Sequence, residues 1–230
     1  MSALRGVLFD FNGTLFFDSE MHLAAFREMF RRAGKPALSD EDMIHRMFGR
    51  SNERICREQF IPDAGPAEVA AFTEEKEALY QSFCLQMPER MHLVEGAPAM
   101  LDYLKEAGVP FCLATGSGLE NIVFYREHLG LGRWFSPDRI VYFDGSFPGK
   151  PAPDIYRIAA ARLGLEPADC MVLEDGTSGL RAAAAAGAGA LAALWEARFP
   201  SPLTDGMRVD RELHDLRDWQ ALLAGFGLLR

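Results

Sequence analysis

The sequence lacks most features that would place it outside the ordinary globular proteins. Its four cysteines form no CxxC pair, so buried free thiols are favoured over a disulfide framework, which suits a reducing compartment. It contains no internal repeat and no low-complexity segment. The longest uncharged stretch, residues 182–195, is too short to span a bilayer and is broken by glycines. We therefore expect no membrane partner.

A basic cluster is absent as well. Acidic residues outnumber basic ones by 33 to 24, which gives a formal net charge of −9. That charge would repel a polyanion such as DNA, and the pair Arg31-Arg32 is read as a solvated helix face, so we expect no nucleic-acid partner. Residues 1–10 enter a strand pattern at once, without the arrangement of a signal peptide, which favours a cytoplasmic location.

Short apolar runs alternate with longer helical patterns over most of the chain. Strand-like runs cover residues 7–9, 109–114, 140–142, 170–173 and 190–194, and helical patterns cover residues 97–107, 119–128, 152–163 and 178–186. Glycines close these helical patterns, as expected at helix C-termini. Continuous apolar strands separated by helices predict a parallel sheet that is covered on both faces.

The stretch from residue 17 to residue 93 breaks this alternation. Its apolar spacings predict consecutive helices at residues 19–33, 40–47, 52–60 and 67–87, with prolines between them. We therefore predict an α/β protein with a Rossmann-like parallel sheet core, formed by residues 1–16 and 94–230. A helical cap domain, residues 17–93, is inserted after the first strand.

Polar side chains follow three of the strand-like runs. Asp10 comes directly after the first run, Thr115 after the second, and the pair Glu174 and Asp175 after the fourth. Ligands of parallel sheets bind beyond the carboxyl ends of the strands, so we expect these side chains to meet at one edge. Each also has a plainer reading, because such an aspartate can belong to a turn and such a threonine can cap a helix.

Four segments resemble, in the right order, the four motifs of the haloacid dehalogenase superfamily. They are DFNGTL at residues 10–15, LATGS at 113–117, GKPAPDIY at 149–156 and LEDGTSGL at 173–180. The resemblance covers nearly the whole chain, and the early helical insert is similar to that of the subgroup containing β-phosphoglucomutase and phosphoglycolate phosphatase. The resemblance implies a hydrolase that acts on phosphoric monoesters.

The same resemblance implies a nucleophile and a metal site. Asp10 would attack phosphorus and form an aspartyl-phosphate. A Mg²⁺ cofactor would be held by the Asp10 carboxylate, the backbone carbonyl of Asn12 and the Asp175 carboxylate. Glu174 would be a further ligand or lie close beside them.

Three further residues are implied to handle the phosphoryl group. Lys150 adds a positive charge that lets a phosphoryl dianion and acidic side chains coexist. Thr115 and the backbone N–H of Gly116 can donate hydrogen bonds to the phosphoryl oxygens. The plainer alternatives are a solvated loop lysine and a threonine that caps the helix beginning at Leu119.

One departure from the family pattern bears on activity. Asn12 stands where family phosphatases carry a second aspartate, which protonates the leaving oxygen and then deprotonates the attacking water. An amide cannot transfer these protons, so turnover of poor leaving groups should fall by about 10²–10⁴-fold, and that of acyl or aryl phosphates by less. Asn12 is either native or an engineered change, and further departures at Phe17 and Gly176 favour native divergence.

Two residues of the helical insert are candidate substrate contacts. His22 lies nine residues after Gly13, as a histidine does in many relatives. Arg50 lies in a segment that resembles the loop touching the non-transferring end of a substrate, where it would recognise an anion. Both side chains also have a structural reading, as a histidine on a mixed helix face and as a solvated arginine.

The leading hypothesis is a Mg²⁺-dependent phosphatase that acts on a small phosphorylated metabolite, with a sugar phosphate favoured, and that is slowed by Asn12. Two alternatives stay open. One is a β-phosphoglucomutase-like phosphomutase, and the other is a catalytically weak or inactive protein that binds a phosphorylated metabolite. We expect a monomer or a weak dimer.

Overall fold

The predicted strand-like runs form one parallel sheet. The computed structural model describes residues 4–203 and 206–229. Within those residues the sheet has six strands in the order β3-β2-β1-β4-β5-β6, and all neighbouring strands are parallel. The strands are β1 (Gly6–Phe9), β2 (Phe111–Thr115), β3 (Ile140–Tyr142), β4 (Cys170–Glu174), β5 (Ala190–Leu194) and β6 (Arg211–Leu213). The predicted α/β class with a Rossmann-like parallel sheet is confirmed.

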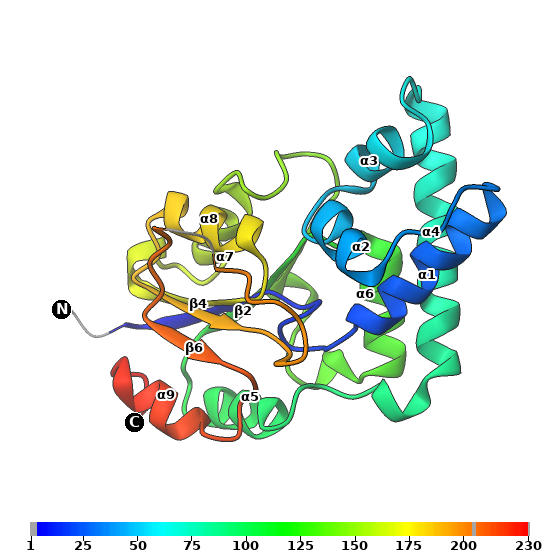
Figure 1. Ribbon diagram of the computed structural model, residues 1–230. Helices are drawn as coiled ribbons and strands as arrows, with labels where there is room; N and C mark the ends of the chain where they lie inside the picture. Colours follow the sequence, from blue (N-terminus) through cyan, green and yellow to red (C-terminus); the bar gives the residue numbers. More distant parts are fainter. Residues whose placement is uncertain (1–3, 204–205, 230) are drawn as a thin grey trace. The chain divides into compact units, whose positions relative to one another are not determined.

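Helices cover both faces of this sheet, which explains why its inner strands are apolar throughout. They are α5 (Ala97–Glu106), α6 (Leu119–His128), α7 (Asp154–Arg162), α8 (Thr177–Ala186) and α9 (Trp219–Gly225). Figure 1 shows α7 and α8 on one face and α5 and α9 on the other. Successive strand residues point to opposite faces. Accordingly, Leu8 packs in a cluster with Ala159 and Ala183, whereas the Phe9 ring contacts that of Phe135 at 6.5 Å between centroids.

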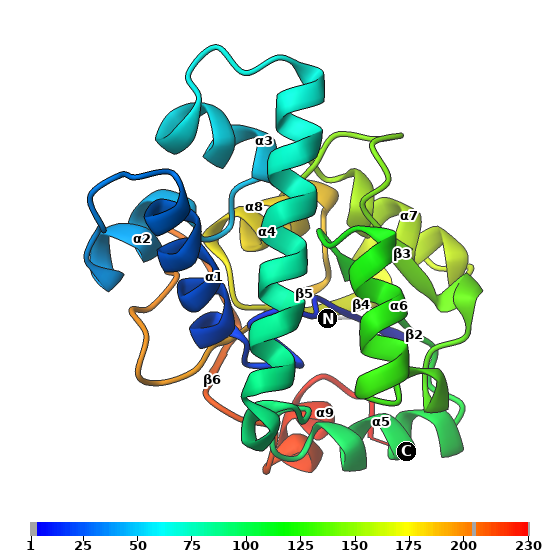
Figure 2. The same cartoon turned by 90° about the vertical axis from the view of Figure 1, so that its right-hand side faces the viewer.

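The chain divides into two compact units. One consists of residues 18–91, called here the helical unit, and the other of the chain on either side, called the sheet unit. The helical unit contains α1 (Ser19–Arg32), α2 (Asp40–Met47), α3 (Asn52–Ile55), a π-helical segment (Cys56–Phe60) and α4 (Pro66–Gln86). Helices α1 and α4 lie side by side (Figure 2). Its core includes a row of tilted aromatic rings, in which the Phe60 ring centroid lies 4.7 Å from that of Phe30 and 5.0 Å from that of Phe72.

Two elements near the C-terminus were not predicted. Strand β6 is three residues long and partly exposed, so it has no apolar run, and it exists because Leu213 and its neighbours pair with the edge of β5. Helix α9 packs against α5. In the described part of the chain, no helix has both the length and the hydropathy needed to cross a bilayer.

Candidate active site

The central strands bring the predicted polar residues to one edge of the sheet. Asp10 follows β1, and its backbone N–H donates to the carbonyl of Leu173 at 3.0 Å, which fixes it beside the end of β4. Thr115 is the last residue of β2, and Glu174 is the last residue of β4. Because β2 and β4 flank β1, the three side chains start from adjacent strand ends. In open parallel sheets, ligands bind where the strand order reverses, and β1 lies at that point.

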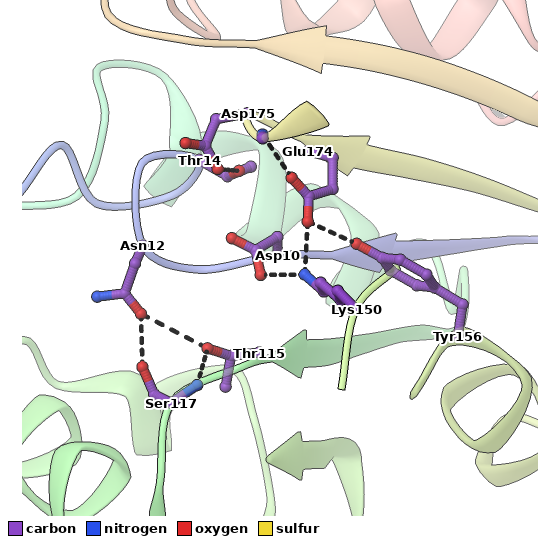
Figure 3. A network of polar contacts seen from close by, with 10 residues as sticks. Asp10, Asn12, Thr14, Thr115, Ser117, Lys150, Tyr156, Glu174 and Asp175 are labelled. Atoms are coloured by element: carbon purple, nitrogen blue, oxygen red, sulfur yellow. Dashed lines mark hydrogen bonds and ion pairs between the residues drawn. The ribbon is translucent and has the colours of Figure 1, made fainter. Parts of the chain in front are cut away.

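A buried ion cluster joins two of these strand ends (Figure 3). The Lys150 Nζ donates to Asp10 Oδ1 at 2.6 Å and to Glu174 Oε1 at 2.5 Å. Glu174 also accepts hydrogen bonds from the Tyr156 hydroxyl at 3.1 Å and from the Gly176 backbone N–H at 2.7 Å. Only 12% of the Lys150 side chain is exposed, against 9% for Asp10 and 3% for Glu174. Lys150 is therefore part of the site and not a solvated loop lysine.

The electrostatics of this cluster keep the lysine charged. Burial by itself would lower the pKa of Lys150, but the carboxylates of Asp10 and Glu174 outweigh it and hold that pKa well above the usual lysine value. Burial also raises the pKa of Tyr156 well above its usual value, and the Glu174 carboxylate adds to the rise. The site therefore presents an ammonium and a neutral phenol to the carboxylates at neutral pH.

Three carboxylates in the sheet unit lie close enough together to hold a divalent cation. One oxygen from each of Asp10, Glu174 and Asp175 lies within 4.8 Å of the others. Oxygen donors of this kind are the ligands that Mg²⁺ prefers. Asp175 is fixed by the Thr14 hydroxyl, which donates to Oδ1 at 3.1 Å. Gly13 leaves room for the Asp175 carboxylate, because a Cβ at that glycine, which has φ +77°, would overlap it. The donor set fits the expected cation.

A second glycine makes room for the buried glutamate. Gly179 lies in the first turn of α8, and a Cβ there would overlap the carboxylate of Glu174. The helix can therefore approach the end of β4 only because this position has no side chain. The close approach lets the Glu174 carboxylate accept from both Tyr156 and Lys150 while it stays 2% exposed.

A separate polar network surrounds Asn12. Its Oδ1 accepts from the Ser117 hydroxyl at 2.7 Å and, over a longer 3.5 Å, from the Thr115 hydroxyl. Its Nδ2 donates to the Tyr125 hydroxyl at 2.7 Å. The Thr115 Oγ1 accepts from the backbone N–H of Ser117 at 3.1 Å, and Gly118 is the N-cap of α6 with no side-chain cap hydrogen bond. Thr115 therefore does not cap that helix.

Comparison with known proteins identifies the family of this chain. Residues 4–187 match the model of the haloacid dehalogenase-like hydrolase family. The chain belongs to this family. The expected superfamily and the expected hydrolase class are thus both confirmed. Hexitol phosphatase A of Escherichia coli, a curated relative, is 30% identical over 215 residues, which cover 92% of this chain and 91% of that protein.

Solved structures of family members agree along most of the chain. A HAD hydrolase of family IA, variant 3, from Entamoeba histolytica is 32% identical with a TM-score of 0.84, and the match covers 94% of this chain and 95% of that one. CbbY from Rhodobacter sphaeroides in complex with xylulose-(1,5)-bisphosphate is 28% identical with a TM-score of 0.77 and covers 92% and 94%. The likeness therefore extends beyond the sheet to the chain as a whole.

The sheet of this family member gathers most, but not all, of the predicted site residues. Gly116 lies at the same edge and is exposed, with open space where a Cβ would be. His22 and Arg50 belong to the helical unit. There the His22 Nε2 lies 3.2 Å from the buried Asp18 carboxylate, and the Arg50 guanidinium pairs with Glu58.

Four residues at the site were assigned no role by sequence reasoning. Thr14, Ser117 and Tyr156 lie inside the motif segments, so their place in those motifs was the available signal. Tyr156 and Tyr125 lie on buried helix faces, where their spacing is that of core residues. Only the folded chain reveals which polar group each tyrosine hydroxyl meets.

Proposed function

We propose that this chain is a Mg²⁺-dependent phosphatase that hydrolyses a small sugar phosphate through an aspartyl-phosphate on Asp10. The observation that carries the proposal is the Asp10 carboxylate, held 2.6 Å from the Lys150 ammonium at the end of the central strand. Two further carboxylates lie beside it. Two relatives, a hexitol phosphatase and a CbbY whose structure holds a sugar bisphosphate, support the substrate class.

The reaction proceeds in two displacements. An oxygen of Asp10 attacks phosphorus, the bond from phosphorus to the sugar oxygen breaks, and that oxygen leaves with the electron pair and must acquire a proton. Water then attacks phosphorus and loses a proton to solvent, the bond to Asp10 breaks, and inorganic phosphate and the free carboxylate are released. Lys150 stays against Asp10 and offsets the negative charge that the phosphoryl dianion brings to the buried carboxylates. The Thr115 hydroxyl and the Gly116 N–H are the proposed donors to the phosphoryl oxygens.

A cation at the three carboxylates would complete this charge balance. Asp10, Asp175 and Glu174 would hold it together with the backbone carbonyl of Asn12, and Mg²⁺ would supply Lewis-acid stabilisation of the phosphoryl oxygens. Thr14 and Gly13 serve this arrangement indirectly, because they fix the Asp175 carboxylate and leave space for it.

The Asn12 amide sets the rate of this enzyme. It cannot protonate the leaving sugar oxygen, so we infer a loss of about 10²–10⁴-fold relative to an acid at the same place, or roughly 3–5.5 kcal/mol of barrier. Acetyl phosphate needs little protonation of its leaving group and should be hydrolysed faster than sugar phosphates.

The test compares three proteins on three kinds of substrate. The natural chain, Asn12→Asp and Asp10→Asn are assayed for phosphate release from acetyl phosphate, p-nitrophenyl phosphate and a panel of sugar phosphates, with Mg²⁺ and with EDTA. We expect Asn12→Asp to gain at least about tenfold on sugar phosphates and less on acetyl phosphate. Asp10→Asn and EDTA should abolish turnover.

Three results would overturn the proposal. Turnover that persists in Asp10→Asn removes the covalent route. Tight binding of a sugar phosphate without hydrolysis by either the natural chain or Asn12→Asp favours a binding protein. Isomerisation of a sugar phosphate without phosphate release would instead indicate a phosphomutase.

Three further expectations stay predictions. The helical unit would serve as a cap in which His22 and Arg50 contact the substrate. The protein would be cytoplasmic, and it would be a monomer or a weak dimer. Cell fractionation and size-exclusion chromatography test the last two.

A further inference from the structure

Tyr125 is a buried residue of the sheet unit that the reaction above does not use. Its side chain is fully buried on the inner face of α6. The ring packs against Phe11 at 4.5 Å and Phe16 at 6.1 Å between centroids, and both are residues of the loop that carries Asp10 and Asn12. The tyrosine hydroxyl lies 2.7 Å from the Asn12 Nδ2.

The loop itself is tightly folded, so its contact with Tyr125 has a defined geometry. The backbone N–H of Gly13 donates to the Phe16 carbonyl at 2.8 Å, and that of Leu15 donates to the Phe11 carbonyl at 2.9 Å. Phe11 and Phe16 are both completely buried. The Tyr125 ring packs against these two rings. This packing fixes the position of the Tyr125 hydroxyl beside the side chain of Asn12.

The hydrogen bonds also determine how the Asn12 amide is turned. The Thr115 Oγ1 accepts from the Ser117 N–H at 3.1 Å, so its own proton can point to Asn12 Oδ1. The Ser117 hydroxyl donates to the same oxygen at 2.7 Å. The amide oxygen therefore faces β2, and the amide nitrogen faces Tyr125. Both ends of the amide are engaged.

We propose that Tyr125 is a positioning residue that holds the side chain at position 12 toward Ser117 and away from the Asp10 carboxylate. Figure 3 shows the Asn12 amide directed at Ser117, whereas the Asp10 carboxylate is directed at Lys150. A tyrosine hydroxyl can also donate, so Tyr125 would hold a carboxylate at position 12 in the same way. The inference rests on the proposed function, and it means that an acid introduced at position 12 would be held back from the leaving oxygen by Tyr125.

The first test is a double-mutant cycle read through the leaving group. In the Asn12→Asp background, Tyr125→Phe should raise kcat for sugar phosphates by a further factor of about three to ten, because the carboxyl group is released toward the leaving oxygen. In the natural background the same substitution should change kcat by less than about twofold, since an amide transfers no proton. The dependence of rate on leaving-group basicity should flatten in Asn12→Asp, and it should flatten further when Tyr125→Phe is added.

Tyr103→Phe is the matched control, because that tyrosine lies in α5 with its ring against Trp219. It should have no effect in either background. An equal effect of Tyr125→Phe in both backgrounds, or a loss of kcat in the double variant with an unchanged thermal transition, would overturn the positioning role.

A second measurement is independent of turnover. The side-chain amide signal of Asn12 in a nitrogen-15 NMR spectrum is identified by its loss in Asn12→Asp. It should shift in Tyr125→Phe and stay in place in Tyr103→Phe. An unmoved signal refutes the inference whatever the activity, whereas a moved signal in a protein that hydrolyses no phosphate ester would keep the inference and refute the proposed function.

Discussion

Replacing Lys150 by methionine tests the charge balance on which the site depends. Methionine keeps most of the apolar stem and removes the ammonium, so the carboxylates of Asp10 and Glu174 would face each other with no cation between them. Both hydrogen bonds of the ammonium, at 2.6 and 2.5 Å, would be lost. The perturbation is therefore almost purely electrostatic.

The burial of the cluster sets the expected size of the effect. The three side chains are between 3% and 12% exposed, so solvent screens their interaction little. Removing one partner of a buried ion pair typically costs about 3–5 kcal/mol. For a chain of this size that loss corresponds to a melting temperature lower by roughly 6–20 °C. We also expect kcat to fall by at least about 100-fold, as for the loss of a preorganised charge at a reacting group.

The stability that Lys150 contributes should change with pH in a defined direction. The folded state raises the pKa of Lys150, so its contribution to stability is complete below the unfolded pKa of about 10.4 and is lost as pH rises through the higher folded pKa. The difference in unfolding free energy between the natural chain and Lys150→Met should therefore be constant from neutral pH to about pH 10 and shrink above it.

Urea unfolding monitored by circular dichroism measures the loss of unfolding free energy in Lys150→Met. Repeating it from neutral pH to above pH 10 measures how that loss depends on pH. Lys105→Met is the matched control, since Lys105 is exposed and its Nζ donates to the backbone carbonyl of Arg133 at 2.6 Å. That control should change the unfolding free energy by no more than about 0.5 kcal/mol. A loss of less than about 1 kcal/mol in Lys150→Met, or a difference that grows above pH 10, would refute the reasoning.

Two further substitutions, one in each unit, test contacts of buried carboxylates. Gly179→Ala should cost about 1–3 kcal/mol in urea unfolding, because its Cβ would overlap the buried Glu174 carboxylate. At Gly176 a Cβ would lie 3.6 Å from the Glu174 carboxylate, so Gly176→Ala should leave the unfolding free energy nearly unchanged. Equal losses of unfolding free energy in the two variants would show that α8 shifts freely to accommodate the added Cβ. In the helical unit, Tyr80→Phe removes a 2.5 Å hydrogen bond to the buried carboxylate of Asp18. It should lower the stability of that unit by about 1.5–3 kcal/mol in thermal melts, and an unchanged melt would mean that another group replaces the hydroxyl.

The sequence by itself determined the fold class and the edge of the sheet at which polar residues gather. Strands that are buried on both faces must be apolar throughout, so β1, β2, β4 and β5 can be recognised in the sequence as short runs of apolar residues. Polar residues placed directly after such runs must lie at the carboxyl edge, which fixed the neighbourhood of Asp10, Thr115 and Glu174. Strand β6 left no such trace, because a partly exposed edge strand of three residues depends on its partner and not on its own pattern.

Only the tertiary structure decided which side chains touch. Lys150 and Asp10 are 140 residues apart in sequence, and their side chains meet only in the folded chain. No local sequence pattern shows whether the Lys150 ammonium contacts Asp10 or solvent. Tyr125 and Tyr156 have the spacing of core residues, and both are core residues, but their hydroxyl groups end at Asn12 and Glu174. A buried polar atom needs a partner, and the identity of that partner is fixed by how helices and strands pack.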